Sequence, residues 1–352
     1  MSDARTAPDV SILVVTSDRV DDLRRCLSKL REHLADPPCP TAEVRTVHGP
    51  DDDVAMQMVA REFPEVHVHR SPAFHISKQR NLAAEAARGR VLIYLDDDAF
   101  PHAGWLSAIY GAFAEAKIVA ASGPVQRGCG SMQCERLASS PIGRLIPLSA
   151  DQPLPPGFAP SFSGCNLAIR RDALLAIGGF DENLPYQPDD MDVTARLFAH
   201  AGRNPDALRY EPLARVTHES SPGPYRRTLE DRAWFTVARD NVYYAMRHAG
   251  VLRGALGGAL LQVPKVLRFS TWMLQGKLRP LAALRCMGKH TAGTLAGLVK
   301  GLRRARLPLP MRITCGPSDA GQGDAEEHAQ TAASSGSGTH PKEPACRQPT
   351  HA

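Results

Sequence analysis

The stretch that decides the fold is VLIYLDDD, residues 91–98, in which an apolar run leads directly into three carboxylates. A short apolar run of this kind is typical of a strand that is buried on both faces of a parallel sheet. Ligand sites of open α/β sheets lie beyond the carboxyl ends of their strands, which is where Asp96, Asp97 and Asp98 stand. Adjacent anions repel one another, and a divalent cation that prefers oxygen ligands, Mg²⁺ or Mn²⁺, resolves the conflict. A solvated acidic turn explains the triplet equally well, so the rest of the chain has to decide.

Strand and helix alternate through the first 100 residues, with short connections. Buried strands are expected at residues 10–16, 42–47 and 66–69, and helices at 20–34, from 51 onward, and at 76–88. This alternation predicts an α/β fold with a Rossmann-like, doubly wound and mostly parallel central sheet. The first strand is followed by no Gly-x-Gly-x-x-Gly fingerprint, and the chain has no Walker loop. A bound nucleotide would therefore need carboxylates and a metal to hold its phosphates.

A second acidic group follows after an interruption. Beyond a helix at 104–116 and a strand at 118–122, residues 123–160 are rich in Gly and Pro and are expected to form an irregular surface excursion. The sequence PDDMD, residues 188–192, then opens a helix with acids in its first turn. Asp190 either caps this helix or is a carboxylate that takes part in a reaction, and the pattern by itself favours capping.

Composition sets limits on the class of protein. The chain has 352 residues with 43% hydrophobic and 22% charged residues, which is typical of a soluble protein with one large or two small domains. Its eight cysteines form no Cys-x-x-Cys pair, so the sequence indicates neither a zinc site nor a disulfide framework. The first nine residues lack an apolar signal core, and charges interrupt the apolar runs before they reach a membrane span. We therefore expect a cytoplasmic protein.

Charge is distributed unevenly along the chain. Residues 226–310 hold 16 Lys/Arg and 3 Asp/Glu, a local balance of +13, so the remainder carries 5 − 13 = −8. The asymmetry indicates an anionic partner, either a membrane surface or a polyanion. Within 251–310, apolar residues alternate with single cations, which favours helices that lie on an anionic membrane surface at its inner face. We expect no nucleic acid as partner. Packing of the same helices against the N-terminal domain is the alternative. The expected domains are 1–225, a basic helical extension at 226–310, and a disordered tail at 311–352.

Taken in order, these motifs resemble a family 2 glycosyltransferase with the GT-A fold, over roughly residues 10–218. The matching features are a first strand that leads into a Thr, an Arg-Asn pair, an Asp-x-Asp motif, a strand followed by a Gly-Gly-Phe-Asp-Glu turn, an acidic helix start and a late His. In this chain they fall at Thr16, Arg80-Asn81, Asp96 to Asp98, residues 164–182, Asp189 to Asp192, and His218.

The resemblance implies an inverting transferase that takes a sugar from a nucleotide-diphosphate donor to a hydroxyl of a glycan or lipid-linked acceptor, in cell-surface polysaccharide or glycolipid assembly. It implies roles for single residues as well. Asp98 and His218 would bind the divalent cation, and Asp190 would be the catalytic base. The implied substrate contacts are Thr16 at the nucleobase, Arg80 at the diphosphate, Asp96 at the ribose, and Asp97 and Asp189 beside them.

One departure concerns the donor nucleotide. The second strand of this family usually ends in an Asp that recognises the base, whereas here His48-Gly49-Pro50 stands at that place. Two other functions stay open. A nucleotidyltransferase also places acids and a metal at strand ends, but it usually has a Gly-rich loop after its first strand. A non-catalytic nucleotide-sugar-binding module would have no use for Asp190.

Overall fold

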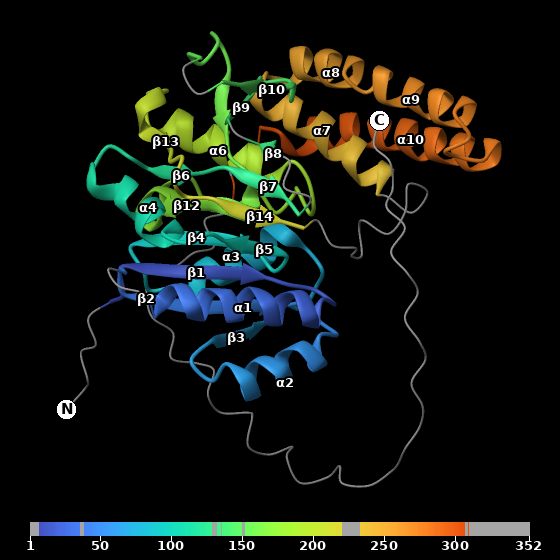
Figure 1. The fold of residues 1–352 in the computed structure, drawn as a ribbon. Helices are drawn as coiled ribbons and strands as arrows, with labels where there is room; N and C mark the ends of the chain where they lie inside the picture. Colours follow the sequence, from blue (N-terminus) through green and yellow to red (C-terminus); the bar gives the residue numbers. More distant parts are fainter. Residues whose placement is uncertain are drawn as a thin grey trace, which may run out of the picture. The chain divides into compact units, whose positions relative to one another are not determined.

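The computed structural model describes residues 7–35, 39–128, 132–134, 136–149, 152–219, 233–306 and 309 (Figure 1). In this part of the chain, a seven-stranded sheet has the order β13-β6-β12-β4-β1-β2-β3. Neighbouring strands are parallel except at β12, which is antiparallel to both β4 and β6. The predicted doubly wound, mostly parallel sheet is confirmed. The strands are β1 (Val10–Val15), β2 (Ala42–His48), β3 (His67–Arg70), β4 (Val91–Asp96), β6 (Ala120–Ser122), β12 (Leu167–Arg170) and β13 (Leu208–Tyr210).

Helices cover both faces of this sheet because its strands present apolar side chains in both directions. Along β4, Ile93 and Leu95 join one buried cluster, whereas Leu92 and Tyr94 join another. This is the two-sided burial that the uninterrupted apolar run of β4 predicts. The first cluster includes α1 (Val20–Leu34), α2 (Asp53–Glu62) and α4 (Trp105–Gly111), and the second α3 (Ile76–Ala86), α5 (Arg171–Ala176) and α6 (Asp189–His200).

Short strands replace the irregular excursion that the sequence predicted for residues 123–160. The described part of this segment contributes to two small sheets, with orders β5-β14-β7-β8 and β10-β9-β11. The prediction was wrong because these strands are only three or four residues long, and Gly and Pro between them hide the pattern. Their bounds are β5 (Ala99–Pro101), β7 (Val125–Arg127), β8 (Met132–Cys134), β9 (Arg136–Ser139), β10 (Leu145–Leu148), β11 (Ala159–Ser161) and β14 (Val216–His218).

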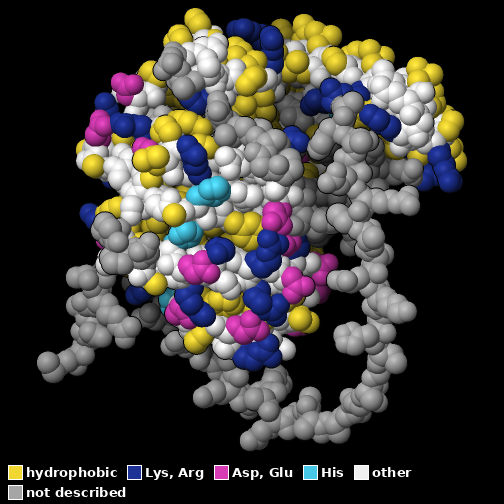
Figure 2. Space-filling view, in the orientation of Figure 1, with side chains coloured by type: hydrophobic (Ala, Val, Ile, Leu, Met, Phe, Trp, Pro, Cys, Tyr) yellow, Lys and Arg dark blue, Asp and Glu magenta, His cyan; other side chains and the backbone are white. Residues whose placement is uncertain are grey.

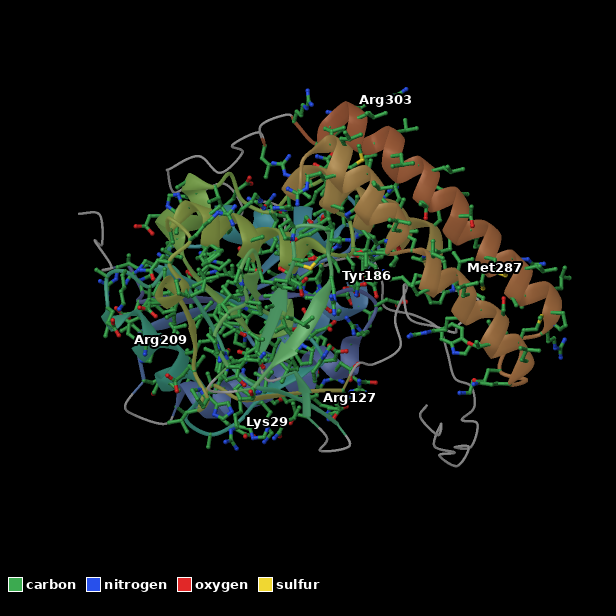
Figure 3. All side chains as sticks on the ribbon, turned by 90° about the horizontal axis from the view of Figure 1, so that it is seen from above. Lys29, Arg127, Tyr186, Arg209, Met287 and Arg303 are labelled. Carbon is green, nitrogen blue, oxygen red and sulfur yellow. The ribbon has the colours of Figure 1, made fainter. Side chains whose placement is uncertain are left out.

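The predicted C-terminal α-helical extension is confirmed, and Figure 3 shows it beside the sheet, with Met287 toward the end that lies far from it. Glycines bring two of its helices into close contact. A Cβ at Gly293 would lie 2.2 Å from the carbonyl oxygen of Phe235, and a Cβ at Gly297 would lie 2.5 Å from that of Arg239. Any side chain there would force the helices apart. The helices are α7 (Trp234–His248), α8 (Val251–Leu260), α9 (Val263–Leu274) and α10 (Pro280–Arg304).

The extension is tied to the sheet domain by polar contacts as well as by apolar packing. The Tyr243 hydroxyl of α7 donates a hydrogen bond of 2.7 Å to Asp181, and the ammonium group of Lys300 in α10 donates to the carbonyl oxygen of Asn183. Among the described helices, none combines the length and the apolar character that a membrane crossing requires. The domain boundary at 225 and the tail at 311–352 lie outside the described residues, so both stay predictions.

Candidate functional site

The acidic strand end is the first part of the site. Because β1 and β4 are parallel neighbours in register, Thr16 follows β1 at the edge where Asp97 follows β4. The Thr16 hydroxyl donates a 2.7 Å hydrogen bond to Asp97, whose carboxylate has no exposed area. Strand β14 runs antiparallel to β5, which brings His218 Nε2 to 3.1 Å from Asp98 Oδ1 and to 3.8 Å from Asp96 Oδ2.

Arg19 joins two of these acids, which the sequence analysis missed. Its guanidinium lies 2.8 Å from Asp97 Oδ1 and 2.8 Å from Asp98 Oδ2. The residue before it, Asp18, has a φ of 58°, in the left-handed region that non-glycine residues seldom adopt. The turn after β1 thus directs a cation back onto the strand end. Asp18 and Arg19 directly follow the first strand in the sequence, but no pattern in the sequence indicated that Arg19 contacts Asp97 and Asp98.

The second part of the site is the start of α6, and Arg80 connects it to the first part. Nη1 of Arg80 lies 2.5 Å from Asp189 Oδ2, and Nη2 lies 3.4 Å from Asp96 Oδ1. The side chain of Arg80 is 6% exposed, so a nearly buried guanidinium stands between the two acidic groups. The acids at 96–98 and at 189–190, nearly 100 residues apart in sequence, therefore share one site.

Gly164 makes room for this bridge. A Cβ at residue 164 would lie 2.4 Å from Nη2 of Arg80, so any other residue would displace the guanidinium. The backbone N–H of Gly164 donates to Asp190 Oδ2 at 3.1 Å, and the N–H of Met191 donates to Asp190 Oδ1 at 2.8 Å. Asp190 lies in the first turn of α6, whose N-cap is Pro188 and has no side-chain cap hydrogen bond, so these two backbone hydrogen bonds fix Asp190 beside Arg80 instead of capping the helix.

The electrostatics of the site are strongly perturbed. Burial raises the pKa of Asp97 to about 7 against the opposing effect of Arg19, and raises that of Asp189 to about 7 against Arg80. Burial also raises the pKa of Asp190. For His218, burial lowers the pKa, but the contact with Asp98 outweighs it and the result is a pKa of about 11.

The site has the composition of a cation site. Among the described residues, five carboxylates (Asp96, Asp97, Asp98, Asp189 and Asp190) face two guanidinium groups, those of Arg19 and Arg80. Both ring nitrogens of His218 are buried, and within the described part of the chain neither makes a well-aligned hydrogen bond, although Asp98 Oδ1 lies 3.1 Å from Nε2. Excess buried anionic charge beside an unsatisfied imidazole fits a divalent cation, and carboxylate oxygens are ligands that Mn²⁺ and Mg²⁺ accept.

Asp192 differs from its neighbours on the same helix. His248 Nε2 lies 2.8 Å from one of its oxygens, and Arg196 Nη2 lies 2.6 Å from the other. Burial raises its pKa, but the guanidinium of Arg196 and the hydrogen bond with His248 outweigh the burial and hold the pKa well below its usual range. Asp192 is therefore a fully buried carboxylate that fastens α6 to α7.

Cys165 is a further residue that the sequence analysis did not place in the site. It lies in the 3₁₀ turn η2 (Gly164–Asn166), directly before β12. Its Sγ, a carboxylate oxygen of Asp96 and a ring nitrogen of His218 all lie within 4.8 Å of one another. The three residues come from separate elements, so their spacing in the sequence carried no signal.

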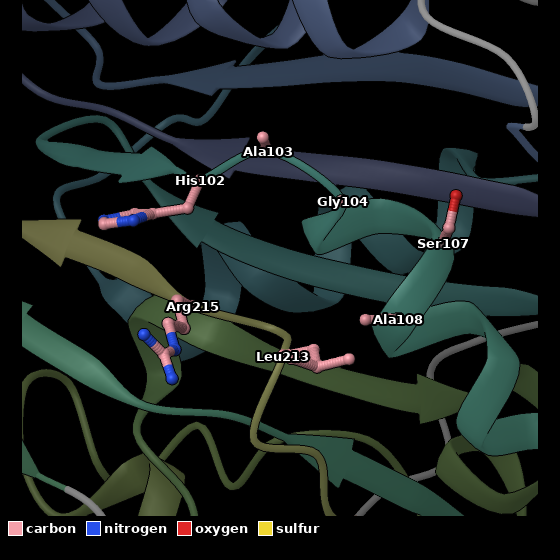
Figure 4. Close-up of a pocket in the computed structure, with 7 residues that line it drawn as sticks. All are labelled: His102, Ala103, Gly104, Ser107, Ala108, Leu213 and Arg215. Carbon is pink, nitrogen blue, oxygen red and sulfur yellow. The ribbon is translucent and has the colours of Figure 1, made fainter.

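An open hollow of about 690 Å³ lies elsewhere, at the start of α4 (Figure 4). Its lining consists of His102, Ala103, Gly104, Ser107, Ala108, Leu213 and Arg215. It is located at the other end of the β5–β14 pair from Asp98 and His218. None of the predicted site residues lines it, so the hollow is separate from the acidic site.

The structure thus brings every predicted site residue to one edge of the sheet, and the role of each stays a prediction. At the end of β2, the predicted departure in base recognition has a structural counterpart. His48 is fully buried, with its ring nitrogens 3.0 Å from the Thr46 hydroxyl and 3.3 Å from Asp52. In this structure its ring is engaged by its own neighbours.

Comparison with known proteins points to one family. Residues 11–178 match the model of Glycosyl transferase family 2. The mannosyltransferase PcManGT from Pyrobaculum calidifontis, solved with GDP-Man and Mn²⁺, has a TM-score of 0.50 at 16% identity, over 84% of this chain and 87% of its own.

GalNAc-T7, crystallised with UDP, GalNAc and Mn²⁺, has a TM-score of 0.50 at 16% identity over 68% of this chain, which covers 48% of GalNAc-T7. This chain therefore spans about half the length of GalNAc-T7. At such identities the likeness shows the fold. No curated protein sequence matches the chain.

Proposed function

This chain belongs to glycosyltransferase family 2 through its residues 11–178, and we propose that it is an inverting, metal-dependent enzyme that transfers a sugar from a nucleotide-diphosphate donor to a hydroxyl acceptor. The observation that supports this most directly is the bridge of Arg80 between Asp96 and Asp189. It places two acidic groups on either side of one buried cation. Transfer of a sugar needs two such groups, because one must serve the leaving diphosphate and the other the incoming hydroxyl.

Asp98 and His218 would hold the cation, with Mn²⁺ or Mg²⁺ as the ion. The solved structures of similar fold that contain a nucleotide or nucleotide sugar together with Mn²⁺ support this choice. When bound, the ion would supply positive charge for the diphosphate as it departs. Asp96 would accept hydrogen bonds from the ribose, and Thr16 would line the base pocket while it orients the buried Asp97.

Arg80 is suited to the diphosphate because its planar guanidinium can make paired hydrogen bonds to phosphate oxygens. In the structure its two terminal nitrogens contact Asp189 and Asp96. A diphosphate would exchange the longer of these contacts, that of 3.4 Å, for a phosphate oxygen. Asp189 would keep the guanidinium in place, and its contact with substrate would be indirect.

Asp190 would act as the base. Its two backbone hydrogen bonds hold the carboxylate still, and burial favours its taking up a proton. A base must stand on the side of the sugar opposite the leaving group, and attack from that side inverts the anomeric carbon. The same geometry supplies what a general base requires, namely a fixed acceptor with a raised affinity for the proton.

The proposal is tested by incubating the full chain with a panel of nucleotide sugars and Mn²⁺ and measuring the released product. We expect release of a nucleoside diphosphate that depends on the metal and that Asp98→Asn reduces. Release of pyrophosphate would instead identify a nucleotidyltransferase, and no release with any donor that binds would identify a binding module. The same panel identifies the nucleobase of the donor, which is open because His48 stands where the family usually has a base-recognising Asp.

We further propose that the C-terminal helices bind the inner face of the cell membrane and bring a lipid-linked acceptor to the site. Large apolar side chains are exposed along them: Leu252, Leu256, Leu260, Val263, Leu267, Leu274, Leu281, Leu284, Leu295, Val299 and Leu302. Residues 241–306 contain no Asp or Glu, while exposed cations include Arg268, Lys277 and Arg285.

Figure 2 shows hydrophobic side chains along the outer edge of these helices, with Lys and Arg among them. An apolar face flanked by cations is the composition of a helix that lies in an anionic interface. Packing on the catalytic domain, the alternative for this segment, applies to α7 and the inner face of α10. The exposed leucines belong to the remaining faces, so the two interpretations describe different sides of the same extension.

A further inference from the structure

Cys165 places a thiol against a carboxylate and an imidazole. One ligand atom each from Cys165, Asp96 and His218 lie within 4.8 Å of one another. Cys165 is 2% exposed and His218 is 4% exposed, whereas the side chain of Asp96 is 25% exposed. The cluster is therefore enclosed by protein on the sulfur and nitrogen sides and reachable from the carboxylate side.

A second observation points to a ligand at this place. Both ring nitrogens of His218 are buried without a hydrogen bond in the described residues, although Asp98 is 3.1 Å away. A buried polar group without a hydrogen bond destabilises the folded protein unless a ligand satisfies it. The Sγ of Cys165 has the hydroxyl of Ser163 at 3.2 Å and lies beside the imidazole of His218. Coordination of a cation would satisfy the imidazole and the thiolate together.

We propose that Asp96, Cys165 and His218 form a site for a borderline-soft divalent cation, Zn²⁺ or Co²⁺, with one oxygen, one sulfur and one nitrogen ligand. Thiolate and imidazole are ligands that Zn²⁺ prefers, and three protein ligands leave a fourth position open. Mg²⁺ has little affinity for sulfur. Cys165 would thus give this strand end a preference for Zn²⁺ or Co²⁺ over Mg²⁺ that carboxylates alone would not create.

Metal binding would require small movements of the three ligand side chains. With a metal–sulfur bond of about 2.3 Å and a metal–nitrogen bond of about 2.0 Å, ligand atoms of a tetrahedral site are about 3.5 Å apart. Atoms now within 4.8 Å reach this by side-chain shifts of about an ångström. On binding, the thiol proton passes to solvent buffer and a metal–sulfur bond forms, so no electron is transferred.

The inference rests on the proposed function at one point, since His218 and Asp96 would also serve the donor complex. A soft cation held by Cys165 would occupy both residues. Zn²⁺ is then expected to act as a competitor of Mn²⁺ rather than as its substitute. The presence of the sulfur-containing site can nevertheless be tested without any donor.

The test uses the full chain, stripped of metal with a chelator and then titrated with Co²⁺ in the absence of nucleotide sugar. A thiolate bound to Co²⁺ gives a charge-transfer band in the near ultraviolet, and tetrahedral coordination gives strong visible bands. We expect both in the unaltered chain, saturating at one equivalent, and loss of the charge-transfer band in Cys165→Ser. Cys26→Ser is the matched control, because Cys26 is also buried and its Sγ lies 3.8 Å from the carbonyl oxygen of Asp96.

A charge-transfer band that persists in Cys165→Ser, or that is absent from the unaltered chain, would overturn the proposal and leave Cys165 as a small apolar core residue. If circular dichroism shows that Cys165→Ser is unfolded, Cys165→Ala takes its place. X-ray absorption of the Zn²⁺-loaded chain gives an independent decision, since a sulfur neighbour must be present. A chain that transfers sugar but shows no sulfur ligand refutes this inference and leaves the proposed function intact.

Discussion

The acidic edge of the sheet and the C-terminal helices both depart from the usual pattern of polar residues outside and apolar residues inside. The first buries carboxylates, and the second exposes leucines. At the end of β4 and the start of α6, Asp97, Asp98 and Asp189 are buried at 0–3% exposure. On the helices, Leu252 and Leu274 are 85% and 82% exposed. A single exposed leucine means little, whereas a buried acidic cluster or a continuous exposed apolar face is informative. The first feature suits chemistry with anions, and the second suits contact with a lipid surface.

Helix α7 connects the two regions. His248 contacts Asp192 on the helix that begins with Asp190, and Tyr243 donates to Asp181 in the turn before it. The extension therefore supports the proposed catalytic helix from behind. The two regions differ in the chemistry of their surfaces but are joined by the contacts of α7. Variants can test the surfaces and these contacts separately.

The largest effect is expected from Asp190→Asn. Loss of a general base slows a reaction by about 10²–10⁴-fold, while the shape and hydrogen bonds of the residue are largely kept. Transfer should fall by this amount with donor affinity unchanged, as measured by product release and by calorimetry. Asp206→Asn, at an exposed acid, should have no effect. Retention of full activity in Asp190→Asn would remove this residue as the base.

Asp192→Asn tests the mechanical connection. It leaves Arg196 and His248 without their buried counterion, at a cost of about 3–5 kcal/mol in the free energy of unfolding. Because the folded pKa of Asp192 is lowered, its stabilisation is present above the ordinary pKa of 3.8 and is lost as the pH falls through the folded value. Denaturant unfolding should therefore show a large difference between the two chains at neutral pH that narrows in acid. A constant difference at all pH values would contradict the ion-pair account.

Replacement of Leu252, Leu256 and Leu260 by Gln tests the surface of the second region. Each leucine that enters the interface contributes up to about 1.5–3 kcal/mol, so the triple variant should lose most of its binding to anionic vesicles in a flotation assay. Leu213→Gln is the control, since Leu213 is 67% exposed on the other part of the molecule. Transfer to a water-soluble acceptor should be unchanged. Equal flotation of the triple variant and the control would rule out this membrane contact.

Gly164→Ala should produce a smaller and more local effect. The added methyl group forces Nη2 of Arg80 to move, so donor affinity should fall by about tenfold, the loss of one charged hydrogen bond. Gly111→Ala is the matched control because its Cβ meets no atom within 4 Å. If the two variants bind the donor equally well, Arg80 does not contact the diphosphate.

The pH profile should show the smallest effect. Burial raises the pKa of Asp190, although Arg80 opposes the shift, and Asp96 raises it further. The base works as a carboxylate, so the turnover number at saturating Mn²⁺ and donor should begin to fall, as the pH is lowered, above the ordinary Asp pKa of 3.8. An acidic limb at or below that value, in a chain that stays folded, would contradict the raised pKa.

The sheet and its acidic edge were predictable because each depends on a local pattern. The apolar run before Asp96 predicts a strand, and parallel strands bring their ends to a common edge. From these two facts, a common site for the acids at 96–98 and at 189–190 could be anticipated once the order of motifs was recognised. The helical extension was likewise visible from its spacing of apolar residues and cations.

The contacts that depend on tertiary packing were not predictable. Arg19 reaches Asp97 and Asp98 only because Asp18, in the turn after β1, adopts a left-handed backbone conformation. Cys165 meets His218 because β14 returns beside β5, more than 100 residues later. The short strands within residues 123–160 were missed for the same reason, since their partners are decided by the folded sheet.

The most direct measurement is an anomalous difference map from a crystal of the full chain soaked with Mn²⁺ and a nucleoside diphosphate. We expect one Mn²⁺ peak in contact with Asp98 and His218, with the diphosphate between that peak and Arg80, and its terminal phosphate directed toward Asp190. A peak at any other place, or a diphosphate bound without contact to the acids at 96–98, would contradict the account.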